Sequence, residues 1–297
     1  MQVGEGGLTL VVIGVGLIGG SFALALKRAG KVARVIGVGR SAANLQRAVE
    51  LGVIDEASHD AATAVARADL VLVATPVGQM GRVFAEIAPH LPADCVLTDG
   101  GSTKSDVVAL MRQHLPGQLA HCVPAHPIAG SDLSGAAAAQ YGLYDNRRIV
   151  VTPLPETDPT AAELVRELWQ ACGARVYQMS AGEHDAVFAT VSHLPHLLAF
   201  AYVDAIVGKA DAERCFDFAA TGFRDFTRIA GSHPEMWRDI ALANRDALLV
   251  ELDTFQQTLD ALRAELEAGD AEAMMQRFER ARAARQSWQQ KFNRGNA

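Results

Sequence analysis

The stretch LTLVVIGVGLIGGSFALALKRAG, residues 8–30, decides the fold of this chain. Its first six residues are mostly apolar and rich in β-branched side chains, which is typical of a strand buried in a parallel sheet. Gly14, Gly16 and Gly19 follow with the G-x-G-x-x-G spacing, and an alanine-rich apolar run predicts a helix ending at Gly30. We interpret the glycines, in order, as a tight turn, a close approach of pyrophosphate to the backbone, and close packing of helix on strand. The stretch predicts a dinucleotide-binding turn with the phosphates at the helix N-terminus.

The context of the glycines supports this interpretation, since a glycine-rich turn alone also forms in ordinary strand-to-helix connections. A second strand is predicted over residues 33–38, and it ends about 20 residues past Gly19, as dinucleotide-binding folds require. Gly39, Arg40 and Ser41 follow it, with no Asp or Glu to bind the ribose hydroxyl groups. Arginine binds a phosphate through its planar fork and serine can donate to it. We therefore predict that Arg40 and Ser41 favour NADP, with NAD possible; the alternative is a solvated arginine in a polar turn.

Length and charge limit the classes of protein that need to be considered. The 297 residues allow about two domains, and 49% hydrophobic residues are typical of a globular chain. The formal charge is −7, from 27 basic and 34 acidic residues with no basic run, so we expect no nucleic-acid partner. The four cysteines lie far apart, which indicates neither a disulfide framework nor a zinc site. Without a leader pattern or about 18 consecutive apolar residues, we expect a cytoplasmic protein with no membrane span.

Strands and helices alternate through the first half of the chain. This alternation predicts a doubly wound, Rossmann-type parallel sheet with ligands at the carboxyl ends of its strands. Thr75 and Pro76 close the third predicted strand at that edge, so we place them in the cofactor site. The later strands are predicted over residues 70–74, 95–98, 119–123, 149–152 and 174–177, and the later helices over 42–51, 79–87, 103–112 and 160–171.

The pattern changes near residue 180, where strand signals stop. Long amphipathic helices are predicted over residues 181–207, 234–262 and 270–292. We therefore predict a dinucleotide-binding domain over 1–179 and an all-α substrate and dimerisation domain over 180–297. Wide apolar helix faces in a small domain are commonly buried against a second subunit, so a homodimer is expected.

Three groups of residues carry chemistry. Ser102 lies in a turn after a strand, where it either caps a helix or reaches a nicotinamide. His126 lies just past the strand predicted over 119–123; a lone histidine is usually structural, but this edge of the sheet needs a base that takes a hydroxyl proton as hydride leaves. His193 and His196 are three residues apart and share a helix face. Two histidines at this spacing can bind a metal, but no further ligand has suitable spacing, so none is expected.

These residues identify the chain as resembling the prephenate and arogenate dehydrogenases of tyrosine biosynthesis. The resemblance covers nearly the whole chain, through residues 14–21, 99–104, 126–135, 192–200 and 222–240. In the glycine turn it adds Leu17 and Ile18 to the cofactor-binding residues. It implies that His126 accepts the proton of the substrate's ring hydroxyl, and that Ser102 orients this hydroxyl beside the nicotinamide.

The resemblance also implies roles in the helical half. His196 joins the catalytic residues and His193 the substrate-binding residues. Arg228 resembles the arginine that binds a substrate carboxylate, with Arg224 and Trp237 in the same motif. Relatives often have Lys at the position of Arg224, and the arginine of this chain keeps the charge but changes its geometry. The pair that shapes the substrate entrance would be Ser131 and Asp132, where relatives carry Thr-Glu.

The reaction implied is NAD(P)-dependent oxidative decarboxylation of prephenate to 4-hydroxyphenylpyruvate. Arogenate, or both substrates, is the alternative; the positive Arg224 favours the keto acid of prephenate over the ammonium of arogenate. Two other classes are weighed against this. A 3-hydroxy acid dehydrogenase needs a catalytic lysine in the first helix of the helical half, and residues 181–207 contain none. A cofactor-binding protein without catalysis needs no set of histidine, serine and arginine.

Overall fold

The computed structural model describes residues 7–130 and 133–295. Its contacts divide the chain between Arg245 and Asp246 into two compact units. The first unit contains both sheets and the helices as far as residue 243; the second is a pair of long helices. The domain boundary predicted after residue 179 stays a prediction.

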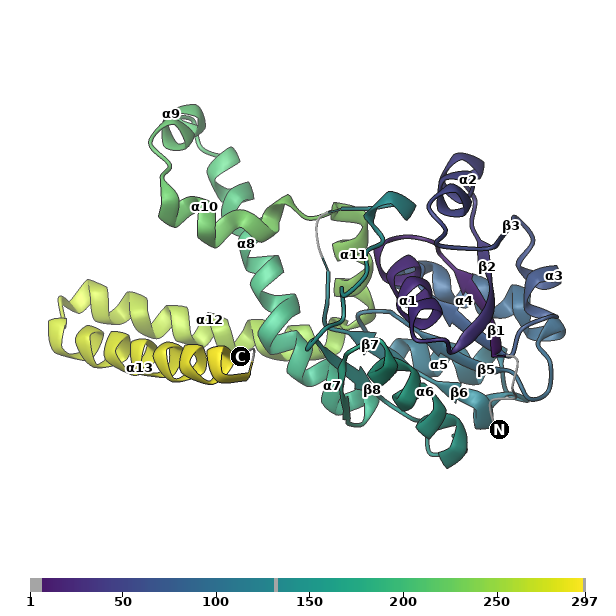
Figure 1. Ribbon diagram of the computed structural model, residues 1–297. Coiled ribbons are helices and arrows are strands. Elements are labelled where there is room, and N and C mark those ends of the chain that lie inside the picture. Colours follow the sequence, from purple (N-terminus) through teal and green to yellow (C-terminus); the bar gives the residue numbers. More distant parts are fainter. Residues whose placement is uncertain (1–6, 131–132, 296–297) are drawn as a thin grey trace. The chain divides into compact units, whose positions relative to one another are not determined.

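The first unit is built on a sheet of six parallel strands in the order β3-β2-β1-β4-β5-β6 (Figure 1). The order reverses between β1 and β4, and ligands of such sheets bind outside the carboxyl ends of the strands at this point. The predicted doubly wound sheet is confirmed. Its strands are β1 (Leu8–Ile13), β2 (Val32–Val38), β3 (Glu56–Ser58), β4 (Leu70–Val73), β5 (Val96–Asp99) and β6 (Cys122–Val123).

The central strand β1 is apolar on both faces because both faces are covered. Leu10 and Val12 belong to one buried core, whereas Val11 and Ile13 belong to the other. The first core includes apolar residues of α1, α2 and α6, and the second those of α3, α4 and α5. These helices are α1 (Leu17–Arg28), α2 (Ala42–Glu50), α3 (Ala61–Val65), α4 (Val77–Ile87), α5 (Ser105–His114) and α6 (Pro159–Ala171).

A second, three-stranded sheet was not predicted from the sequence. It consists of β7 (Ala125–Pro127), β8 (Arg148–Val151) and β9 (Arg175–Gln178), with β7 antiparallel to β8. The expected strand over 119–123 was too long: Leu119–His121 is a 3-10 turn and β6 has two residues. Pro124, which has no N–H for a ladder, lies where the chain leaves the large sheet for the small one. The new strand β7 carries His126.

After residue 180, the described part of the chain consists of helices joined by short turns and contains no strand. The helix predicted over 234–262 is interrupted at Asn244, whose side chain bonds to another segment, as described below. The elements are α7 (Ala181–Phe188), a π turn (Ala189–His193), α8 (Leu194–Val207), α9 (Ala212–Asp217), α10 (Thr221–Thr227), a 3-10 turn (Arg228–Gly231), α11 (Pro234–Ala243), α12 (Arg245–Ala268) and α13 (Ala271–Gly295).

The run Ala181–Val207 is long and apolar enough to cross a membrane, by length and composition alone. Core helices of soluble proteins have the same property. The run includes His184 and Asp185, whose side chains are bonded to other elements of the first unit. The expectation of a protein without a membrane span stays a prediction.

The second unit is a helical hairpin of α12 and α13, shown in yellow in Figure 1. Gly269 adopts a positive φ of 65° between the helices, a conformation in which glycine carries no steric cost. An ion pair between Arg277 and Glu265 joins α13 to α12. Several apolar side chains of these helices are exposed, namely Leu249, Leu259, Leu266, Met275, Phe278 and Trp288.

Candidate active site

The glycine turn after β1 fits a dinucleotide. Gly14 has a φ of 101°, and a Cβ there would lie 2.6 Å from the carbonyl oxygen of Ala74. A Cβ on Gly19 would lie 2.6 Å from the side chain of Val12, whereas the space above Gly16 is open. No side chain caps α1, and its first turn, which begins with Leu17 and Ile18, has no acidic residue. The backbone N–H groups at this helix end are therefore available for a pyrophosphate.

The residues that follow β4 and β5 lie at the same edge of the sheet as the glycine turn. A Cβ on Gly100, after β5, would lie 3.0 Å from the side chain of Ile18 and 3.8 Å from that of Pro127. Thr75, after β4, has a buried hydroxyl without a hydrogen-bond partner among the described residues, and Pro76 precedes the first turn of α4. An orphaned buried hydroxyl at this edge fits a bound polar ligand. The structure thus brings the predicted phosphate turn beside the strand that carries His126.

Arg40 and Ser41 lie at the carboxyl end of β2, as predicted. Arg40 is exposed. Ser41 caps the N-terminus of α2, and its Oγ accepts a hydrogen bond of 3.2 Å from the backbone N–H of Asn44. Their role in selecting the cofactor stays a prediction.

A buried ion pair fixes the turn that contains Ser102. Asp99 and Lys104 are both fully buried and bonded to each other. The carboxylate of Asp99 also accepts from the backbone N–H of Gly101 at 2.7 Å and of Ala125 at 3.0 Å, and Lys104 Nζ donates to the carbonyl of Ala125 at 2.8 Å. Since Ala125 precedes His126, the pair anchors the strand of the proposed base. A buried charge is stable only when paired in this way.

His126 is the first member of a hydrogen-bonded chain of three side chains. Its Nδ1 lies 2.8 Å from Nε2 of His184, and Nδ1 of His184 lies 2.8 Å from Oδ1 of Asp185. The ring of Phe188 packs against both histidine rings, with centroids 4.9 and 4.4 Å away. His184 and Asp185 are buried, whereas His126 keeps part of its surface accessible. One side of His126 is therefore held by the protein, and the other can meet a ligand.

The carboxylate of Asp185 also caps the N-terminus of α5, although Asp185 lies far from that helix in the sequence. Its carboxylate accepts from the backbone N–H groups of Lys104 at 2.9 Å and Ser105 at 2.7 Å. Ser102 lies three residues before α5 begins, so the alternative of a capping role for Ser102 is wrong. Burial alone would raise the pKa of Asp185, but hydrogen bonds from His184 and from this helix end lower it below its usual value. Asp185 is an anion at neutral pH.

The anionic Asp185 and the burial of the two histidines determine which imidazole nitrogens carry protons. Burial lowers the pKa of His184, against the pull of Asp185, and holds the pKa of His126 well below its usual value. Both rings are therefore neutral at pH 7. A carboxylate only accepts, so Nδ1 of His184 carries its proton, Nε2 of His184 accepts from Nδ1 of His126, and Nε2 of His126 keeps its lone pair. The chain presents His126 as a neutral base.

His193, His196 and Trp237 form a second group beside the first. Nδ1 of His193 lies 3.0 Å from the amide nitrogen of Asn244, which also donates to the backbone carbonyl of Asp185 at 2.8 Å. Burial lowers the pKa of His193 to about 4, with a bond to the Ser102 backbone partly opposing it. His196 stacks on the buried Trp237, with ring centroids 3.4 Å apart, and burial lowers its pKa too. His193 is thus connected through Asn244 to Asp185 and so to the chain that holds His126, Ser102 contacts His193 through its backbone, and His196 lies three residues after His193.

Arg224 and Arg228 differ from the histidines of the site, because both arginine side chains are exposed to solvent. Arg228 lies in the 3-10 turn after α10, which packs against α8, the helix of His196, and its charge adds to the lowering of the His196 pKa by burial. The Arg224 side chain is 72% exposed and pairs with Asp225 at 3.0 Å. No described contact brings Arg224 to the histidines. Ser131 and Asp132 lie outside the described residues, and within the described ones no cluster of three or more metal-ligating side chains is present.

Sequence reasoning missed His184, Asp185, Asn244 and the pairing of Asp99 with Lys104. Asp99 and Lys104 lie within residues 99–104, and the available signal was a carboxylate at the end of an apolar strand, five residues before a lysine that precedes a helix. His184 contacts a residue 58 positions away, and Asp185 one 81 positions away. No local pattern shows such a pairing.

The fold and this site define a nicotinamide-dependent oxidoreductase. Comparison with known proteins narrows the class: residues 22–178 match the nucleotide-binding domain of prephenate dehydrogenase and residues 180–280 match its dimerization domain. The chain belongs to the prephenate dehydrogenase family.

Individual relatives agree with this assignment. The chain is 39% identical over 276 residues to a prephenate dehydrogenase of Bacillus subtilis, covering 92% of this chain and 74% of that protein. It is 36% identical over 278 residues to a cyclohexadienyl dehydrogenase of Zymomonas mobilis, covering 93% and 94%. The crystal structure of A. aeolicus prephenate dehydrogenase in complex with hydroxyphenyl propionate and NAD+ superposes with a TM-score of 0.89 at 33% identity, covering 94% of this chain and 97% of that one.

Proposed function

We propose that this enzyme converts prephenate to 4-hydroxyphenylpyruvate by oxidative decarboxylation. The observation that carries the proposal is the chain from Asp185 through His184 to His126, which leaves a neutral imidazole nitrogen at the carboxyl edge of a dinucleotide-binding sheet. The family and the nucleotide-binding domain support it.

The reaction requires little covalent work from the protein. A bound nicotinamide would supply the acceptor for the hydride that leaves C4 of the ring. Nε2 of His126 takes the proton of the C4 hydroxyl, which leaves a ring ketone. The C1 carboxylate then leaves as carbon dioxide, its bonding electrons complete the aromatic ring, and the phenolate oxygen takes the proton back from His126. Because the ring becomes aromatic, the main tasks of the side chains are positioning and removal of one proton. Ser102 would orient the hydroxyl, and His196 on Trp237 would form the wall that faces the ring.

Arg228 would bind a substrate carboxylate, since its charge already acts on His196. Arg224 would act at the side chain of the substrate, where prephenate carries a keto acid and arogenate an ammonium group. A guanidinium disfavours the ammonium, which supports prephenate. Activity on arogenate as well is the second candidate, favoured by the similarity to a cyclohexadienyl dehydrogenase.

The test is the initial rate with prephenate or arogenate, each with NAD or NADP. We expect a higher kcat/KM for prephenate. A higher value for arogenate would overturn the substrate assignment, and no reduction of either cofactor with either substrate would overturn the proposed function.

We infer a preference for NADP from the end of β2. Arg40 is exposed there, and Ser41 has a hydroxyl proton to donate. An acid that would repel a 2′-phosphate is missing from Gly39 to Ser41. We expect Arg40→Ala to lower kcat/KM for NADP and to leave that for NAD nearly unchanged. A wild-type preference for NAD, or equal losses with both cofactors, would contradict the inference.

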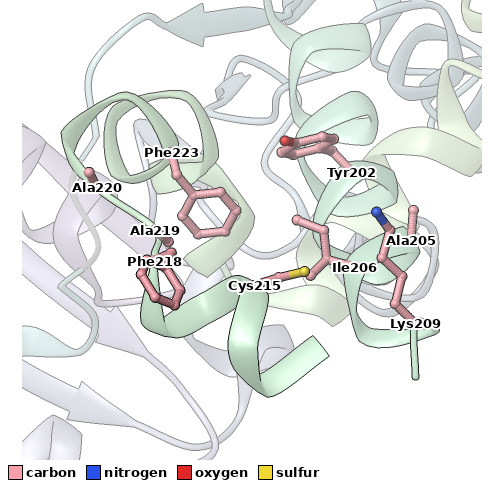
Figure 2. A pocket seen from close by; sticks show the side chains of 9 residues that line it. All are labelled: Tyr202, Ala205, Ile206, Lys209, Cys215, Phe218, Ala219, Ala220 and Phe223. Atoms are coloured by element: carbon pink, nitrogen blue, oxygen red, sulfur yellow. The ribbon is translucent and has the colours of Figure 1, made fainter. Parts of the chain in front are cut away.

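We further propose a homodimer formed through residues after 180. The match to a dimerization domain supports it, as do exposed apolar side chains around a pocket between α8, α9 and α10 (Figure 2). Tyr202, Ile206, Cys215, Phe218 and Phe223 line this pocket, and Phe218 is 81% exposed. A second copy of the chain would cover this surface. Light scattering at micromolar concentration should give the dimer mass, and Phe218→Glu should weaken the dimer where Leu51→Glu, an exposed site outside the domain, does not. A monomeric wild type would contradict the proposal.

A further inference from the structure

His59 lies at the carboxyl edge of the six-stranded sheet, beside the end of β2. It directly follows β3, the edge strand beside β2, and its Nδ1 is 2.9 Å from the backbone carbonyl oxygen of Gly39. The N–H of Gly39 donates to the carbonyl of Ser58 at 3.3 Å. The two strand ends are thus joined at Gly39, the position at which an NAD-binding sheet places its ribose-binding acid.

The surroundings of His59 suit an anion. Parallel strands end at the same edge of a sheet, so His59 shares this edge with Arg40 and Ser41. Arg40 has no hydrogen-bond or ion-pair partner among the described residues. Ser41 caps α2, whose first turn has no acidic residue. A basic side chain, a hydroxyl and a helix N-terminus converge there.

We propose that His59 is a specificity-determining residue that binds the 2′-phosphate of NADP together with Arg40 and Ser41. The proposal rests on the NADP preference inferred above and names a third residue for it. Because the carbonyl of Gly39 only accepts, Nδ1 of His59 carries a proton; when Nε2 is protonated too, it donates to a phosphate oxygen. The imidazolium adds a positive charge that NAD cannot use.

The acidic groups near His59 are already paired with other residues. Asp60 accepts the backbone N–H of Thr63 at 3.1 Å and also its hydroxyl, at the start of α3. Glu56, on β3, is bonded to Arg34 and Arg67. Arg40, in contrast, has no ion-pair partner among the described residues, and its positive charge attracts the same phosphate.

A structural role for His59, in which it only joins β3 to Gly39, has a different signature. Asn places a side-chain amide near the position of Nδ1 but has no group at Nε2. His59→Asn therefore keeps the bond to Gly39 and removes the phosphate contact, whereas His59→Ala removes both. His121→Asn is the matched control, because His121 lies ahead of β6, at the opposite edge of the sheet.

The experiment measures binding of 2′,5′-ADP and 5′-AMP by calorimetry, without substrate and at one fixed pH. The wild type should prefer 2′,5′-ADP, and His59→Asn should weaken that ligand about five- to tenfold while leaving 5′-AMP unchanged. His121→Asn should match the wild type.

Each other outcome rejects a defined part of the account. If His59→Asn keeps the full wild-type preference, or weakens both ligands equally, the role of His59 is wrong and that of Arg40 stands. If the wild type binds 5′-AMP as tightly as 2′,5′-ADP, both the NADP preference and the role of His59 are wrong. Neither result bears on prephenate oxidation, which the activity assay decides separately.

Discussion

Two parts of the proposed site differ sharply in their contact with water. The side chains of Asp99, Lys104 and His184 are fully buried and that of Asp185 is 6% exposed, and each has a hydrogen-bond partner. Arg224, in contrast, is 72% exposed, and Arg228 is exposed as well. Fixed, desolvated dipoles act strongly on a transition state, whereas water screens exposed charges. The buried part should therefore control kcat and the exposed part KM.

The buried part is tested most severely at His126. His126→Asn should lower kcat about 10²- to 10⁴-fold with little change in substrate affinity, because proton transfer is lost while ground-state contacts remain. Steady-state kinetics with prephenate measure this, and the exposed His90→Asn serves as the control. A variant with wild-type kcat would exclude His126 as the base.

Asp185→Asn should show that the base depends on its partners. An amide nitrogen facing Nδ1 of His184 reverses the hydrogen-bond pattern, which puts a proton on Nε2 of His126. The expected loss is about 10²-fold in kcat, in keeping with a wrong tautomer and lost outer-shell support. Asp106→Asn is the matched control in the first turn of α5, since burial already raises the pKa of Asp106. Equal kcat values for the wild type and Asp185→Asn would show that the Asp185 carboxylate does not contribute to catalysis.

The neutral state of His193 predicts a pH dependence of stability. Its pKa is about 4 in the folded protein against 6.5 for an ordinary histidine. The unfolded chain therefore binds a proton first as the pH falls, and the stability held above pH 6.5 is lost progressively toward pH 4. The contribution of His193 is about 1 to 3 kcal/mol. Urea unfolding at several pH values should give a shallower decline for His193→Asn, and parallel declines would contradict the assignment.

The exposed part should give smaller effects, on binding. Arg228→Ala should raise KM for prephenate about tenfold with kcat nearly unchanged, less than truncating a buried charge pair costs, because water screens an exposed guanidinium. Arg238→Ala, an exposed arginine of α11 paired with Asp239, is the control. Unchanged KM would remove Arg228 from the substrate site.

Arg224→Asp should have the smallest effect, a change of a few-fold in the ratio of kcat/KM for prephenate to that for arogenate, toward arogenate. The reason is the reversed charge near the substrate side chain. Measuring both substrates with one enzyme preparation gives the ratio directly. An unchanged ratio would show that Arg224 does not distinguish the substrates.

The parts of this molecule that the sequence predicted are those with a local signature. The β-branched run before Gly14, the spacing of the three glycines and the repeated strands were sufficient for the large sheet and its phosphate-binding turn. The strand β3 has three residues, none of them large and apolar, and was therefore missed. The small sheet was missed as a separate sheet because short strands do not show which sheet they join.

The site was predicted where a residue has a motif around it, and missed where long-range folding creates the contact. His126, His193 and His196 lie in recognisable motifs. His184 and Asp185 begin an otherwise ordinary helix, and their function depends on β7 and α5 reaching them. The π turn Ala189–His193 could not be predicted from the sequence either, although such turns are frequent at functional sites.

The central claim is that Asp185 and His184 hold His126 as a neutral imidazole with a free Nε2. Imidazole ¹⁵N NMR of the ligand-free enzyme at pH 7 tests it directly, with the His126 signals assigned by comparison with His126→Asn. We expect a protonated Nδ1 and an unprotonated Nε2 in His126, changing to the opposite tautomer in Asp185→Asn. An imidazolium, or a proton on Nε2 of His126 in the wild type, would contradict the account.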